Sequence, residues 1–176
     1  MDIDLFYRNI NRPNSKIPLL DQLKSQDYLT TQTLQGITKV IKENMEIDFL
    51  VRQMGAGQME PYLIKSINVR AEGLRGLDLL NNYPLTVQAN GYAITTPSPQ
   101  AYVLHKLLLN PKRKIKQEKD IEGIKALLRQ IKQTNDEGEL LKITYDKLSK
   151  KEKNIIHEVC DHNDIDLPDL IGTLFS

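Results

Sequence analysis

The sequence has one cysteine, almost no net charge and no long apolar segment. Because Cys160 is the single cysteine among 176 residues, no disulfide can form within the chain, which fits a reducing compartment. A net charge of +1 gives no global argument for binding nucleic acid or a membrane surface. No apolar run reaches the ~18 residues of a membrane span, and no basic region followed by an apolar core marks a signal peptide. These absences predict a cytoplasmic protein without a membrane partner.

Several familiar site motifs are missing too. There is no G-x-S-x-G and no serine or cysteine triad. His157, Cys160 and His162 lack a fourth ligand at zinc spacing. Cys160 lies in an apolar helical segment, so we expect a buried thiol and not a nucleophile.

The order of the expected elements predicts an α+β fold, with a mixed or antiparallel sheet first and a helical region last. Strands are expected over 2–7, 33–43, 46–51 and 63–71, and in a hairpin over 85–96. Helices are expected over 100–109, 120–132, 140–148 and 150–162, with a polar linker over 134–138. We therefore expect a sheet domain over 1–97 and a helical region over 98–176.

Local signals mark three of these boundaries. Asn90-Gly91 is the dipeptide preferred in a two-residue type I′ hairpin turn. Ser98 is a candidate N-cap with Pro99 at the first helical position. Ser149 followed three residues later by Glu152 is a capping-box pattern that predicts a helix to about His162.

Acidic residues alternate with apolar ones in two of the short strands. Asp2 and Asp4 share one face of the first strand, and Asp48 lies on the acidic face of the segment 46–51. If the two strands are neighbours, the three carboxylates converge, and a divalent cation such as Mg²⁺ relieves their repulsion. Such a site suits two-metal phosphoryl or nucleotidyl transfer. The alternative is an ordinary strand with a solvated acidic face.

A basic segment follows the expected sheet. Residues 112–119 carry five positive charges in eight positions, and the segment ends at Lys119-Asp120. It can contact the phosphates of a nucleotide or of RNA, or it can simply be a solvated helix start. No aromatic residues interleave with it, so stacking on single-stranded bases is poorly supported.

Taken together, these motifs resemble those of the nucleotidyltransferase superfamily that includes DNA polymerase β. The resemblance covers about residues 1–132 and is greatest to small bacterial stand-alone members, some of which are toxins of toxin–antitoxin pairs. It rests on Asp2-Ile3-Asp4-Leu5, Ile47-Asp48-Phe49, Pro97-Ser98-Pro99, His105-Lys106-Leu107, Lys112-Arg113-Lys114 and Lys119-Asp120.

The resemblance implies a Mg²⁺-dependent enzyme that transfers a nucleoside monophosphate from an NTP, such as ATP, to a hydroxyl acceptor. It implies that Asp2 and Asp4 hold the metal and that Asp48 completes a second metal site and helps to activate the acceptor. Lys106 and Lys119 are the implied contacts to the nucleotide phosphates. Asp120 and Arg113 are further implied nucleotide-binding residues, with Asp120 orienting a lysine or the acceptor.

One feature of the family lies outside the resemblance. The family carries a Gly-Ser or Gly-Gly turn upstream of the D-x-D strand, whereas only Met1 precedes Asp2 here. We therefore expect an N-terminally incomplete sheet, with an exposed edge open to self-association or to an antitoxin. The second hypothesis is a catalytically inactive module of the same fold that binds RNA, a nucleotide or a partner protein.

Overall fold

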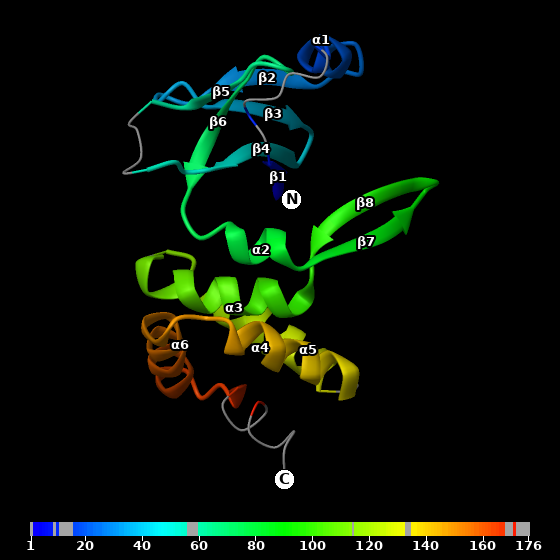
Figure 1. Ribbon diagram of the computed structural model, residues 1–176. Helices are drawn as coiled ribbons and strands as arrows, with labels where there is room; N and C mark the ends of the chain where they lie inside the picture. The colour runs from blue at the N-terminus through cyan, green and yellow to red at the C-terminus, as the bar shows by residue number, and fades with distance from the viewer. Residues whose placement is uncertain are drawn as a thin grey trace. The chain divides into compact units, whose positions relative to one another are not determined.

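A computed structural model describes residues 2–8, 10, 16–55, 60–113, 115–132, 135–167 and 171, with only the backbone of Asp2 and Asn135. The chain divides into two compact units, Met1–Leu77 and Asp78–Ser176. The first contains a sheet and a short helix, and the second contains a hairpin and several helices (Figure 1). The predicted α+β fold, with strands first and helices last, is confirmed. The domain boundary expected after residue 97 stays a prediction.

The first unit consists of six strands and one helix. These are β1 (Asp2–Tyr7), α1 (Leu19–Lys24), β2 (Leu29–Gln32), β3 (Thr38–Lys42), β4 (Met45–Arg52), β5 (Tyr62–Ile64) and β6 (Val69–Leu74). The strand order is β2-β3-β4-β6-β5, with β1 also paired to β4. Strand β4 is parallel to β1 and to β6 and antiparallel to β3, so the predicted mixed sheet is confirmed.

Strand β4 is the centre of this sheet. Strand β1 pairs with it from Glu46 to Val51. Strand β3 pairs with the first half of β4, and β6 pairs with its last three residues. Because β1 takes one edge of β4 along most of its length, β3 and β6 follow one another along the other edge. The core of the unit consists of Val40, Ile47, Phe49, Val51, Tyr62, Ile64, Ile67, Val69 and Ala71.

Two of the expected strands were wrong, because each is interrupted by a turn. Residues 33–43 are not one strand, because a turn precedes β3: Gly36 has φ +81° and its N–H donates to the Thr33 carbonyl. Residues 63–71 are likewise two antiparallel strands, β5 and β6, separated by a turn in which Asn68 has φ +52°. In both places turn geometry interrupts an alternating pattern, which periodicity alone does not reveal.

The close packing of Gly73 of β6 against the Tyr62 ring can be tested by substitution. A Cβ at Gly73 would lie 2.3 Å from Cε2 of the buried Tyr62 ring, so Gly73→Ala forces the ring to move. We expect a loss of about 1–3 kcal/mol in the free energy of unfolding of the first unit, measured by urea denaturation. The matched control is Gly123→Ala, since nothing lies within 4 Å of a Cβ there. That change is expected to stabilise its helix by up to about 1 kcal/mol. Equal effects of the two substitutions would contradict the packing.

The second unit consists of a hairpin and helices. Its elements are α2 (Asp78–Asn82), β7 (Pro84–Ala89), β8 (Tyr92–Pro97), α3 (Pro99–Leu109), the 3-10 helix η1 (Asn110–Lys112), α4 (Gln117–Ile131), α5 (Asn135–Asp146) and α6 (Lys150–His162). Strands β7 and β8 pair only with each other among the described residues (Figure 1). The core forms around α3, with fully buried residues that include Leu104, Leu107, Ile124, Ile131, Leu141 and Ile156. Within the described ranges, no helix is both long and apolar enough to cross a bilayer.

The local signals of this unit are confirmed. Asn90 and Gly91 both have positive φ and form the two-residue turn of the hairpin. The Ser98 hydroxyl accepts a hydrogen bond from the Ala101 N–H, with Pro99 opening α3. Ser149 and Glu152 form the reciprocal capping box of α6.

The linker expected over 134–138 was wrong, because α5 already begins at Asn135. Gly138 is buried inside this helix, and the Glu137 carbonyl accepts a hydrogen bond from Gln100 of α3. These tertiary contacts outweigh the low helix propensity of glycine.

The single cysteine is a buried helical thiol, as predicted. Cys160 lies on α6 and is 1% exposed. Burial, with a smaller contribution from Asp161, raises the pKa of the Cys160 thiol to about 12. The thiol is therefore protonated at physiological pH and is a poor nucleophile.

Candidate active site

The acidic face of the sheet is defined here by Asp2, Asp4, Glu46 and Asp48. In the parallel pairing of β1 with β4, Asp2 is opposite Glu46 and Asp4 is opposite Asp48. Paired residues of neighbouring strands point to the same side of a sheet, and that side is opposite to the buried Ile47 and Phe49. The positions predicted for the two strands are therefore adjacent.

The described side chains of this face are accessible. Asp4 is exposed, and the side chain of Asp48 retains 28% of its exposure. Neighbouring strands lie about 4.8 Å apart, so the register partners Asp4 and Asp48 occupy adjacent positions on the same face.

A lysine that the sequence analysis did not single out contacts two of the carboxylates, those of Glu46 and Asp48. Lys39 of β3 is the register partner of Asp48, and its Nζ is 3.2 Å from Asp48 Oδ1. The same ammonium group also forms an ion pair and hydrogen bond with Glu46. Lys39 thus neutralises part of the negative charge of the acidic face.

The donor set of the acidic face fits a hard divalent cation. Carboxylate oxygens are the ligands that Mg²⁺ prefers, and one or two of them together with substrate phosphates are the usual set. Among the described side chains there is no cluster of three His, Cys, Asp or Glu residues able to hold a metal. Asp4 and Asp48 supply two carboxylates on one face, and in a site of this kind phosphate oxygens would complete the coordination.

A second charged cluster forms in the helical unit from three residues that the sequence analysis named. Lys106 of α3 is 3.1 Å from Asp120 Oδ1, and Arg113 Nη1 is 3.2 Å from Asp120 Oδ2. The Asp120 side chain is only 8% exposed. The ammonium group of Lys106 also lies 5.3 Å from the centroid of the Tyr102 ring, a cation–π distance.

The rest of the basic segment is arranged differently. Lys119 is exposed in the first turn of α4 and takes no part in the Asp120 cluster, while Lys112 and Lys116 are exposed as well. Arg113 is held by Asp120, so part of the segment stabilises the helical unit. That this segment and the acidic face serve one active site stays a prediction.

The comparisons with known proteins identify a family. A family profile described as nucleotidyltransferase matches residues 1–147 of the 176. No curated protein and no solved structure matches the chain.

Proposed function

Because the chain belongs to the nucleotidyltransferase family, we propose that it transfers a nucleoside monophosphate from an NTP to a hydroxyl acceptor in a Mg²⁺-dependent reaction. The observation that carries this proposal is the pairing of Asp4 with Asp48 on the accessible side of two adjacent parallel strands. Asp2, the register partner of Glu46, extends the same row of carboxylates.

The bound Mg²⁺ would neutralise the phosphates and make the α-phosphorus a better electrophile. In the proposed step the acceptor oxygen forms a bond to the α-phosphorus while the bond to the bridging oxygen of the β-phosphate breaks. Pyrophosphate leaves, and the proton of the acceptor hydroxyl passes to the carboxylate of Asp48. Asp2 and Asp4 would hold the Mg²⁺ that binds the nucleotide phosphates.

The helical unit supplies the proposed phosphate contacts. Lys106 and Lys119 would each place an ammonium group against the nucleotide phosphates. Asp120 orients Lys106, because it already forms ion pairs with Lys106 and Arg113. We further propose that the acceptor is a tRNA, a protein hydroxyl or a small molecule, and that the protein binds either an antitoxin or a second copy of itself.

The direct test is transfer from a panel of α-³²P-labelled NTPs to these acceptor classes, with Mg²⁺ or with EDTA. We expect label in one acceptor with Mg²⁺ and none with EDTA or with Asp4→Asn. Label transfer that persists at full rate in Asp4→Asn would refute the assignment of the acidic face.

A second candidate function is favoured by Lys39. If its ammonium group substitutes for the metal ion, the chain is an inactive module of the same fold that binds RNA, a nucleotide or a partner protein. This candidate predicts nucleotide or RNA binding that does not require Mg²⁺ and that survives loss of Asp4.

Lys39→Met tests whether the lysine takes the place of a divalent cation, on which the second candidate depends. If the lysine competes with a cation for Glu46 and Asp48, its removal strengthens Mn²⁺ binding by about 1.4- to 30-fold, as expected for one or two partly exposed ion pairs of about 0.2–1 kcal/mol each. Mn²⁺ titration followed by electron paramagnetic resonance measures this directly. Lys42→Met is the matched control, because Lys42 of the same strand donates to the Gln26 carbonyl and not to the acidic face. Weaker binding in Lys39→Met would contradict the competition.

A further inference from the structure

The hairpin of β7 and β8 is exposed on both of its faces. Every residue from Pro84 to Pro97 is exposed except Thr96, which is partly buried. In the part of the chain that the structure describes, the two strands pair with each other and with no other strand. A two-stranded hairpin without further packing is only marginally stable in water. The hairpin is therefore expected to pack against a partner surface.

The base of the hairpin is fixed to the helices of its own unit. The Ser98 N–H donates a hydrogen bond of 2.8 Å to the Tyr83 carbonyl, while the Ser98 hydroxyl caps α3. The ammonium group of Lys147, directly after α5, lies 5.1 Å from the centroid of the Tyr83 ring. From this base the two strands project away from α3 (Figure 1). The hairpin is thus anchored at one end and presents its strands outward.

The two faces of the hairpin differ in polarity. Residues that pair across the two strands share a face, and Val87 pairs with Ile94. We call their side of the hairpin the apolar face, which consists of Leu85, Val87, Ala89, Tyr92, Ile94 and Thr96. Its four large apolar side chains remain between 40% and 73% exposed. An antiparallel sheet usually packs such a face on a core, and here the face is open.

The hairpin carries no charge that would keep other chains away. The range 79–104 contains no aspartate, glutamate, lysine or arginine, although 27% of the chain is charged. Exposed strands normally carry charges or prolines that prevent pairing with another chain, and here the prolines lie only at the two ends, 84 and 97. A nucleic acid finds no cation on this surface. A charged protein surface would bury its charges without partners. The partner is therefore uncharged where it touches the hairpin.

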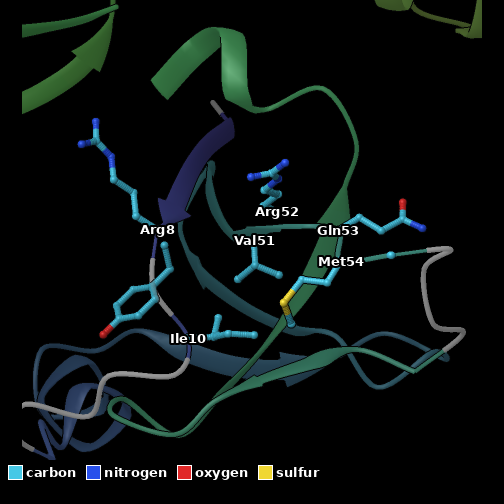
Figure 2. Close-up of a pocket in the computed structure, with 8 residues that line it drawn as sticks. Arg8, Ile10, Val51, Arg52, Gln53 and Met54 are labelled. Carbon is cyan, nitrogen blue, oxygen red and sulfur yellow. The ribbon is translucent and has the colours of Figure 1, made fainter. Parts of the chain in front are cut away.

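The shape of the hairpin also differs from that of a small-molecule site. Figure 2 shows a cavity at the ends of β1 and β4, of about 320 Å³, with Ile10, Val51 and Met54 in its lining. A hollow of this kind can enclose a small ligand. A two-stranded ribbon is instead a nearly flat surface, which fits another flat surface such as that of a protein.

We propose that the apolar face docks on the apolar face of a second copy of this chain. A two-fold contact brings the same patch of both copies together, so the patch must be compatible with itself. A charged patch would repel its own copy, whereas an uncharged apolar ribbon does not. Two stacked hairpins bury Val87 and Ile94 of both copies between four strands, which supplies the packing that one hairpin lacks. The interface does not depend on the proposed nucleotidyl transfer, and an inactive chain dimerises in the same way.

The size of the hairpin sets the expected affinity. Strands of six residues are about 20 Å long, and a pair of them is about 10 Å wide. This area is smaller than the roughly 800 Å² that each partner buries in a standard interface. The dimer is therefore reversible, with a dissociation constant on the order of micromolar.

Analytical ultracentrifugation of the full chain, from about 1 μM to about 500 μM, measures this equilibrium. We expect a monomer–dimer equilibrium for the unchanged chain and at least about tenfold weaker dimerisation for Val87→Lys, because a lysine from each copy then enters the contact. Thr86→Lys is the matched control, since it adds the same charge to the same strand on the opposite face. A chain that is monomeric at every concentration would overturn the proposal, and so would equal dimerisation of the two variants.

Hydrogen exchange of the unchanged chain gives a test that needs no substitution. Amide exchange over 85–96 is expected to slow as the protein concentration rises through the dissociation constant. Exchange in the exposed strand β2 should stay the same. A dimer that forms without slowing exchange in the hairpin would place the contact elsewhere. Protection of the hairpin at every concentration in a monomer would place its partner within the same chain, and either result refutes the proposal.

Discussion

Asp48→Asn is expected to lower nucleotidyl transfer by at least about a hundredfold. Loss of groups that merely orient metal ligands costs about 10- to 100-fold, and a direct ligand that also accepts the acceptor's proton should cost at least as much. The amide of asparagine keeps the size of the side chain but loses the charge that attracts the cation. The measurement is the initial rate of label transfer at saturating NTP.

The fold should survive this substitution. Asp48 and Lys39 form a partly exposed ion pair, so its loss costs at most about 1 kcal/mol of stability. Asp21→Asn is the matched control, since Asp21 is an exposed residue of α1 in the same unit. A rate within threefold of the unchanged chain for Asp48→Asn would remove Asp48 from the catalytic machinery.

Asp120→Ala is expected to destabilise the helical unit by about 2–3 kcal/mol, because it leaves two cations without their carboxylate partner. Lys106 and Arg113 both lose their partner, and the Lys106 side chain is only 17% exposed. For a unit of this size the melting temperature should fall by roughly 8–24 °C, measured by circular dichroism.

The control for Asp120 is Asp146→Ala in the same unit. Asp146 is 3.8 Å from Lys153, and its side chain is 54% exposed, so its removal should cost less than about 0.5 kcal/mol. A melting temperature for Asp120→Ala as high as that of the control would show that the cluster does not stabilise the unit. The double variant Lys106→Met with Asp120→Asn should lose less stability than Asp120→Ala, because it leaves no lysine without a partner.

The helical unit was well predicted because its boundaries are set by local chemistry. Asn90-Gly91, Ser98-Pro99 and the capping box at Ser149 each act within four residues of the chain. Such signals are present in the sequence whatever the tertiary structure is. The start of α5 was missed because Gly138 is helical only through its packing.

The acidic face was predicted in part because alternation assigns residues to faces but not to partners. Sequence alone put Asp4 and Asp48 on accessible faces, and the structure adds their register. Lys39 was missed because the strands expected over 33–43 and 46–51 leave 44–45 as the turn, which would place Ile41 opposite Asp48. The observed turn is Glu43-Asn44, and this shift brings Lys39 there instead. A shift of one residue in a turn moves the register of an antiparallel pair by two.

The Asp120 cluster, too, could not be predicted from the sequence without knowledge of the tertiary structure. Lys119-Asp120 was named as a motif, but the two residues separate in the structure: Lys119 is exposed and Asp120 is buried. One partner of Asp120, Lys106, lies 14 residues earlier, on α3. Only the packing of α3 against α4 brings Lys106 to it.

The central claim is that the acidic face holds a divalent cation. The most direct measurement is a Mn²⁺ titration of the unchanged chain and of Asp48→Asn, followed by electron paramagnetic resonance without nucleotide. The account predicts a saturable site in the unchanged chain that is lost in Asp48→Asn. Identical titrations of the two proteins would contradict it and leave the inactive binding module as the better description.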